Sequence, residues 1–289
     1  GGLGHTRAER LVDDARIAAT RDILAGWAGP AIVATDDPAL PISGATVDFD
    51  QGDYHFGRRL AGIVRRHGLQ RIVYLGGGSL PLLPPESLRR AARGAGPGSA
   101  VTNNLYSSDL IAFDASERTL SAVAATERDN ALARALKEDA GVSVEELPRS
   151  PETLFDIDAP SDVLLLALTG RGGEQTRAYC AALTIDLSRY RALLPLFLDQ
   201  DRQIIIAGRV GSHAWAYLER ETACRVRLFA EERGMEAGGR TAAGSARSLL
   251  AYHLEAVGLQ RFFQTLSALG DAAVIDTRVL LAHNRIEAS

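Results

Sequence analysis

Short apolar runs alternate with segments of helical periodicity along most of the chain. Runs bounded by glycine, proline or polar turns are typical of buried strands, and apolar residues recurring every three or four positions indicate amphipathic helices. Strands are expected at 31–35, 46–49, 71–75, 99–102, 110–113, 142–147, 203–207, 225–230 and 272–276. Helices are expected at 8–27, 54–67, 127–140, 189–198, 214–222 and 246–269. Two more are expected, one that begins at Pro84-Pro85 and one that Asp158 or Ser161 would cap.

This alternation predicts an α/β protein with a layered sheet and parallel strand pairs. The segment Gly170-Arg171-Gly172-Gly173 has the composition of a linker, because glycine lowers the cost of an irregular backbone. We therefore expect a first domain over residues 1–169 and a small α/β appendage over 174–289.

The composition excludes some classes of function but does not identify one. Of the 289 residues 46% are hydrophobic and 24% are charged, so the chain can bury a sizeable core and is not disordered as a whole. The net charge of −4, without a basic tract, does not favour a nucleic-acid partner. Lys137 is the only lysine, so any bound phosphate must be held by arginine, backbone N–H groups or metal.

The longest apolar runs, such as residues 163–168, are too short to cross a membrane, and the first residues do not have the pattern of a signal peptide. A soluble, cytoplasmic protein is expected. Cys180 and Cys224 have no His or Cys at metal-ligand spacing, so buried free thiols are expected instead of a zinc or redox site.

A glycine-rich segment, Gly1-Gly2-Leu3-Gly4-His5-Thr6-Arg7, leads into the first helix. Its N–H groups and the positive end of the helix dipole would hold a nucleotide phosphate. The alternative is a disordered terminus or a tag remnant.

Three further groups of residues are candidates for chemistry. They are Asp156 with Asp158, the run Thr102-Asn103-Asn104 after a strand, and Arg58 on the second helix. Each has a structural alternative: Asp158 would also cap a helix, the asparagines would form a turn, and Arg58 would lie on a solvated face.

The appendage has its own candidates where strands end. Gly208-Arg209-Val210-Gly211-Ser212 links a strand to a helix and would bind an anion. Glu231-Glu232-Arg233 and Asp276-Thr277-Arg278 end two other strands, and ligands gather at strand ends of open α/β sheets. Ordinary loops are the alternative, and the appendage resembles no known family.

Four segments together resemble, in order and spacing, the nucleotidyltransferases of the GT-A fold, and among them the MobA-like proteins and the 2-phospho-L-lactate guanylyltransferases. The resemblance covers about residues 1–169, and the Leu-Pro-Leu-Leu turn and the Asp-Ile-Asp-Ala-Pro-Ser-Asp stretch are its most specific parts. It implies a Rossmann-like, three-layer α/β/α sheet that is mostly parallel. The segments are Gly1 to Arg7, Leu80-Pro81-Leu82-Leu83-Pro84-Pro85-Glu86-Ser87-Leu88, Thr102-Asn103-Asn104-Leu105 and Asp156 to Asp162.

By this resemblance Gly1, Gly2, Gly4 and Arg7 would embrace a triphosphate. Asp156 and Asp158 would contact Mg²⁺, with Asp158 the better candidate, and Thr102, Asn103 and Asn104 would contact the acceptor. Arg58 is a substrate-binding candidate for a different reason, because at the start of a helix it would face an anionic ligand. Ser79 stands where the family has a Mg²⁺-binding aspartate, and a hydroxyl is a weak ligand for a hard cation. The family's loop lysine is also missing, near Glu9 and Arg10.

The leading expectation is an enzyme that transfers a nucleoside monophosphate, GMP by resemblance, to a small phosphorylated or acidic acceptor with Mg²⁺. Phospholactate or phosphoenolpyruvate would be the acceptor, and a molybdopterin- or cobinamide-type acceptor fits nearly as well. The alternative is a binding protein that has lost catalysis, because Ser79 replaces the metal aspartate; the appendage would then supply a regulatory site or a homodimer interface. The Asp-X-Asp motif of sugar transferases is missing near residue 79. Whether a strand precedes Gly1 stays open.

Overall fold

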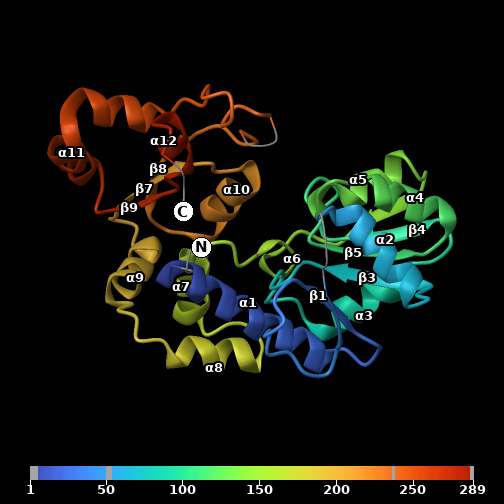
Figure 1. The fold of residues 1–289 in the computed structure, drawn as a ribbon. Coiled ribbons are helices and arrows are strands. Elements are labelled where there is room, and N and C mark those ends of the chain that lie inside the picture. The colour runs from blue at the N-terminus through green and yellow to red at the C-terminus, as the bar shows by residue number, and fades with distance from the viewer. Residues whose placement is uncertain (1–5, 50–53, 236–237, 287–289) are drawn as a thin grey trace. The chain divides into compact units, whose positions relative to one another are not determined.

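The computed structural model describes residues 6–49, 54–235 and 238–286. The chain divides into two compact units, Gly1–Ile185 and Asp186–Ser289, each described here by itself (Figure 1). The linker expected at 170–173 lies inside unit 1, because helix α8 (Glu174–Ala182) packs against helix α1 (Arg7–Gly26).

The expected strands of unit 1 are confirmed to within about one residue at each end. The helix expected at 127–140 is shorter, and a helix at 117–125 was not expected. The strands are β1 (Ile32–Thr35), β2 (Thr46–Phe49), β3 (Arg71–Leu75), β4 (Ser99–Thr102), β5 (Leu110–Asp114) and β6 (Ser143–Glu146). The remaining helices are α2 (Phe56–Arg66), α3 (Pro85–Gly94), α4 (Glu117–Ala125), the 3₁₀ turn η1 (Asp129–Ala131), α5 (Leu132–Glu138), α6 (Pro151–Leu154) and α7 (Pro160–Thr169).

The larger sheet of unit 1 has the strand order β3-β5-β4-β6 and is mixed, which corrects the expectation of a mostly parallel sheet there. Strand β5 runs antiparallel to both β3 and β4, while β4 and β6 are parallel. The reason is the short connection 103–109 between β4 and β5, since a parallel crossover needs a dozen or more residues. Strands β1 and β2 form a separate parallel pair.

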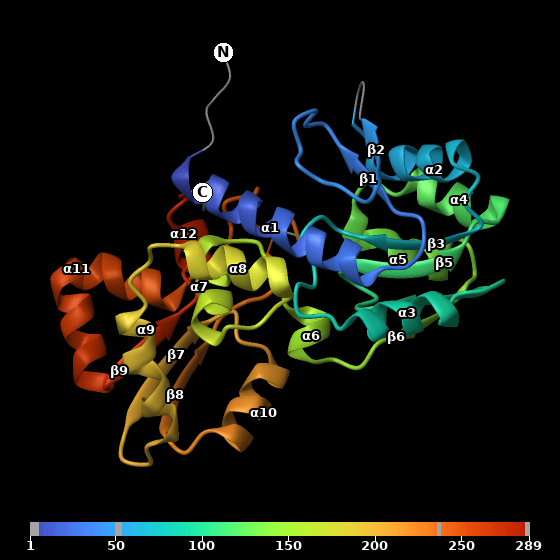
Figure 2. The ribbon, with the colours of Figure 1, turned by 90° about the horizontal axis from the view of Figure 1, so that it is seen from below.

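Alternate residues of the strands face two different apolar layers. Ile111 and Phe113 of β5 pack with α2, α4 and α5, whereas Leu110 and Ala112 pack with α3. Figure 2 shows β3 and β5 between α2 and α4 on one side and α3 on the other. Unit 1 therefore has helices on both faces of a mixed sheet.

A third apolar layer joins α1, α7 and α8. Asp22 of α1 caps the N-terminus of α8, because its carboxylate accepts hydrogen bonds from the N–H groups of Gln175 and Thr176 at 2.8 and 2.9 Å. The cap of α7 is Ala159, not Asp158 or Ser161 as expected. Asp162 satisfies the free N–H groups at the start of α7, accepting from Asp158 and Ala159 at 2.9 and 2.7 Å.

Unit 2 has a three-stranded sheet in the order β8-β7-β9 in which every pair is parallel, as expected for an α/β appendage. Helix α11 covers one face with Leu250, Phe262 and Leu266. Gly258 interrupts α11 with a φ of 75°. The elements are α9 (Ser188–Leu193), η2 (Leu194–Leu198), β7 (Gln203–Gly208), α10 (Ser212–Glu221), β8 (Arg225–Ala230), α11 (Leu249–Leu269), β9 (Ala272–Ile275) and α12 (Arg278–His283).

Within the described residues, none of the helices combines the length and the apolar character needed to span a bilayer. Both cysteines are free: Cys180 is buried, as expected, while Cys224 is partly exposed. Burial raises the pKa of the Cys180 thiol above its ordinary value, so this thiol is a packing residue.

Candidate functional site

One edge of the larger sheet in unit 1 brings together some of the predicted residues, namely Ser79, Asn103, Asp156 and Asp158. The register pairs Leu75 at the end of β3 with Leu110 at the start of β5, because these strands are antiparallel. The turn 76–79 therefore lies beside Asp109. The end of β4 lies at the same edge and brings in Asn103.

The turn after β3 is tightly held. The Ser79 N–H donates to the Gly76 carbonyl at 3.0 Å, and the Gly76 N–H donates to the Asp109 carbonyl at 2.9 Å. Gly78 has a φ of 79°, and a Cβ there would lie 2.3 Å from the Cγ of Arg16, so only glycine fits.

Leu80 follows Ser79 with a φ of 53° and is fully buried. A bulky residue in the left-handed region is strained, and such strain persists only where the surroundings fix it. The backbone around Ser79 is thus held in an uncommon conformation at the turn that the sequence singled out.

Arg16 of α1 joins this turn to the segment 156–158. Its Nε donates to the Ile157 carbonyl at 2.7 Å, and its Nη2 lies 3.5 Å from Oδ1 of the exposed Asp158. A cation therefore already accompanies Asp158.

Asn103 is buried and uses its whole side-chain amide inside the protein. Its Oδ1 accepts the N–H groups of Asp109 and Leu110 at 3.0 Å, and its Nδ2 donates to Asp109 Oδ2 at 3.0 Å and to the Thr153 carbonyl at 3.2 Å. In this structure Asn103 positions Asp109.

Two partly buried carboxylates at this edge have raised pKa values. Burial is the main cause for both. For Asp109, the charges of Asp129 and Asp158 add to the increase, while the hydrogen bond from Asn103 opposes it. For Asp156, burial together with the charges of Asp109 and Asp158 raises the pKa to about 6, and the hydrogen bond with the Ser79 hydroxyl opposes the increase. The edge is therefore a site of concentrated negative charge.

Asp156→Asn is expected to stabilise unit 1 by about 1 kcal/mol above pH 6, after allowing for solvent screening. The folded pKa of about 6 exceeds the ordinary 3.8, so the native state retains a proton that the unfolded state has lost between these values. The wild type therefore loses stability as the pH rises through this window, and the variant does not.

Urea unfolding at about pH 4 and about pH 7.5 tests this difference. Each unit contains one tryptophan, Trp27 or Trp215, so Trp27 fluorescence in a Trp215→Phe background reports unit 1 alone. Equal effects of the substitution at both pH values would contradict the raised pKa.

Several predicted residues have other surroundings. Gly1, Gly2 and Gly4 lie outside the described residues. Arg7 is exposed in the first turn of α1 and Arg58 is exposed on α2; within the described ranges neither has an ion pair with Asp156 or Asp158. Thr102 is buried and donates to the Leu110 carbonyl at 2.8 Å. Asn104 is partly buried and its Oδ1 accepts from the Tyr106 N–H at 3.1 Å, which is an asparagine turn.

The sequence did not single out Asp109, Arg16, Tyr74 or Asp129. Asp109 directly precedes a predicted strand, and this position at a strand end could have identified it as a candidate. Arg16 lies in the middle of a helix, where nothing in the sequence marks it as a site residue. Tyr74 donates from its hydroxyl to Asp129 Oδ2 at 3.3 Å, and burial and Asp129 together raise the pKa of Tyr74, so it stays protonated.

The carboxylates at this edge can be compared with the usual ligands of Mg²⁺. In proteins Mg²⁺ usually binds one or two carboxylates together with phosphate oxygens and water. The charge of Asp109 adds to the raised pKa of Asp156, and a divalent cation would relieve that repulsion. Among the residues that the structure describes, no group of three His, Cys, Asp or Glu side chains is arranged to hold an ion.

Comparisons with known proteins assign no family to the chain. A scan against protein-family models finds no match, and a search of curated proteins finds no significant match. Function must therefore be argued from the residues themselves.

Proposed function

We propose that unit 1 is a nucleotidyltransferase of the GT-A fold, which transfers a nucleoside monophosphate from a nucleoside triphosphate to a small phosphorylated or acidic acceptor. GTP is the proposed nucleotide, and phospholactate or phosphoenolpyruvate the proposed acceptor class. Both rest on the resemblance of residues 1–169 to that family.

The observation that carries the proposal is the convergence at one sheet edge of three segments from the resemblance. The strained turn at Ser79, the Asn103 that holds Asp109, and the carboxylate of Asp156 all lie at this edge. They are separated by long stretches of sequence, and ordinary folding does not require that charged and strained groups collect in one place.

Each residue has a definite role in this proposal. Asp156, with Asp109 or Asp158 as a second carboxylate, would hold Mg²⁺, which when bound neutralises charge on the phosphates. Arg7 would bind the triphosphate, and Asn103 would keep Asp109 in place. Arg16 would fix the segment that carries Asp156.

The second candidate function is nucleotide or metabolite binding without transfer. Ser79 favours it, because the hydroxyl supplies no charge where the family has a carboxylate. The ion pair between Arg16 and Asp158 favours it too, since it already neutralises one of the proposed metal ligands.

Thermal unfolding of the full chain with GTP, ATP, CTP or UTP, with and without Mg²⁺, separates the two functions. The transferase predicts that GTP stabilises unit 1 only when Mg²⁺ is present, and that pyrophosphate is released once an acceptor is added. Stabilisation by a nucleotide without Mg²⁺ indicates binding alone. No effect of any nucleotide contradicts both.

Ser79→Asp gives a sharper test of the metal position. Without metal we expect a destabilisation of about 1 to 2 kcal/mol, because a third carboxylate would join Asp109 and Asp156 at a buried position. Added Mg²⁺ should reverse the loss and bind at least about tenfold more tightly than to the wild type. Ser87→Asp, in the first turn of α3, is the control, and calorimetry that gives the same Mg²⁺ affinity for both variants would contradict the proposed site.

A further inference from the structure

A cavity of about 840 Å³ lies in unit 2, where the parallel strands of its sheet end. Arg209 directly follows β7, and Arg278 begins α12 just after β9. The loop 241–244 and the end of α12 complete the walls. Ligands of open parallel sheets collect at this position, and the volume is that of a small-molecule site.

Three arginines line the cavity with one carboxylate between two of them. Oδ2 of Asp276 accepts from Arg209 Nε at 3.1 Å and from Arg278 Nη2 at 2.8 Å, and its Oδ1 accepts from Arg278 Nε at 2.8 Å. Asp276 thus fixes both guanidinium groups, and each retains further N–H groups as donors.

Arg285 is the third arginine of the cavity wall. Within the described residues its guanidinium has no hydrogen bond or ion pair. Its φ of 56° is strained for a side chain of this size, and its Nε lies 3.2 Å from where a Cβ of Gly244 would be. A glycine at position 244 and an unusual backbone at 285 together place this guanidinium at the cavity.

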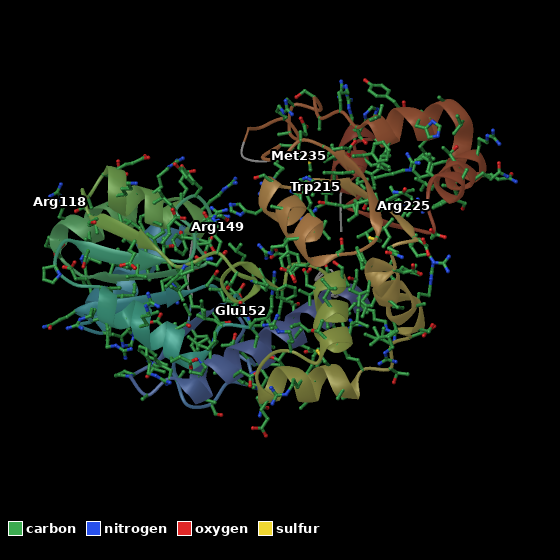
Figure 3. The ribbon with its side chains drawn as sticks, turned by 180° about the vertical axis from the view of Figure 1, so that it is seen from behind. Arg118, Arg149, Glu152, Trp215, Arg225 and Met235 are labelled. Carbon is green, nitrogen blue, oxygen red and sulfur yellow. The ribbon has the colours of Figure 1, made fainter. Side chains whose placement is uncertain are left out.

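The cavity also contains an unsatisfied buried hydroxyl. Thr241 lines it, and the Oγ1 atom of Thr241 is buried with no partner among the described residues. Buried polar atoms are nearly always paired, so this hydroxyl is a candidate hydrogen-bond donor to a ligand in the cavity. Apolar side chains line the cavity beside these polar groups. One of these apolar residues is Met235, which Figure 3 labels on the segment after β8.

We infer that this cavity binds the phosphate group of a small phosphorylated metabolite. Three guanidinium groups and one carboxylate leave a net charge of +2, which a phosphomonoester dianion balances and a single carboxylate does not. Guanidinium forks match phosphate oxygens, and the Thr241 hydroxyl would donate to another oxygen. The inference rests on unit 2 alone and does not depend on the function proposed for unit 1.

Calorimetry of the full chain with inorganic phosphate, at constant ionic strength, tests the inference. We expect saturable binding that Arg285→Gln weakens about tenfold, since a charge-assisted hydrogen bond is lost. Arg285 has no partner in the described protein, so this variant should fold normally. The control is Arg261→Gln, on the exposed surface of α11, which should not change the affinity.

Thr241→Val provides an independent second variant. It should raise the melting temperature of unit 2, followed through Trp215 fluorescence, because a buried unpaired hydroxyl is removed. It should also weaken phosphate binding several-fold, which a merely structural role would not predict. Acetate, as a single-carboxylate probe, should bind more weakly than phosphate.

Three results would overturn the inference. They are the absence of saturable phosphate binding, an affinity of the Arg285→Gln variant equal to that of Arg261→Gln, and tighter binding of acetate than of phosphate.

Discussion

Gly57→Ala is expected to destabilise unit 1 by about 3 kcal/mol or more, through a clash that the fold cannot relieve. A Cβ at residue 57 would lie 1.9 Å from the Val123 carbonyl oxygen and 2.6 Å from that of Thr126. Both are backbone atoms at the end of α4, and the Gly57 N–H also donates to the Thr126 carbonyl at 3.0 Å. Helices α2 and α4 would have to separate and expose apolar residues of the core.

Gly62→Ala is the matched control in the same helix. A Cβ at residue 62 would meet no atom within 4 Å. Alanine is the better helix former, so this variant should be more stable than the wild type by about 0.5 to 1 kcal/mol. Urea unfolding followed through Trp27 in the Trp215→Phe background measures both, and equal effects of the two substitutions would contradict the close approach of α2 and α4.

Asp48→Ala is expected to cost about 3 kcal/mol, because it leaves the largely buried Arg59 guanidinium without its carboxylate. Asp48 lies in β2 and is 8% exposed. Its carboxylate is paired with Arg59 at 2.8 Å, with Arg66 at 2.8 Å and with His67 at 3.0 Å. The substitution should release the pair β1–β2 from α2 before the rest of unit 1 unfolds.

The stability lost in Asp48→Ala should depend on pH, and the direction of this dependence follows from the pKa of Asp48. Burial by itself would raise the pKa of Asp48, but the hydrogen bonds from His67 and Arg66 and the charges of Arg59 and Arg66 together lower it. The stability that the carboxylate contributes is therefore present above its ordinary pKa of 3.8 and is lost as the pH falls through the lower folded value. The gap between wild type and Asp48→Ala should narrow in that acidic range.

Glu117→Ala is the control for Asp48→Ala. Glu117 pairs with Arg65 of the same helix α2, but both side chains are largely exposed, so a loss of about 0.5 kcal/mol or less is expected. Hydrogen exchange of β1 and β2 amides identifies which part opens first. Equal losses of stability in the two variants would mean that the ion pairs of Asp48 contribute no more than an exposed ion pair does.

Periodicity and turn residues were enough to place most elements. Every strand in the described residues was expected, because apolar runs between glycine, proline and polar turns leave few alternatives. The helices α4, α6, α8 and α12 were not expected. Helix α8 depends on a carboxylate from α1 to cap it, and Asp22 lies far from Gln175 in the sequence.

The candidate site was predicted in part. The turn at Ser79 and the segment at Asp156 were identified through resemblance to a family, and their proximity agrees with that expectation. The exposed position of Arg58 on α2 was one of the alternatives that the sequence offered. The internal bonding of Asn103 was not foreseeable, because sequence patterns do not specify which donors a buried amide will satisfy.

By itself the sequence determined an α/β chain with helices and strands at nearly the observed positions, because local propensity and periodicity act over a few residues. Tertiary structure alone decided the antiparallel position of β5, the pairing of Arg16 with Asp158, the raised pKa of Asp156 and the arginine-lined cavity of unit 2. Each of these depends on strand register or on burial between distant segments, and both arise only when the chain packs.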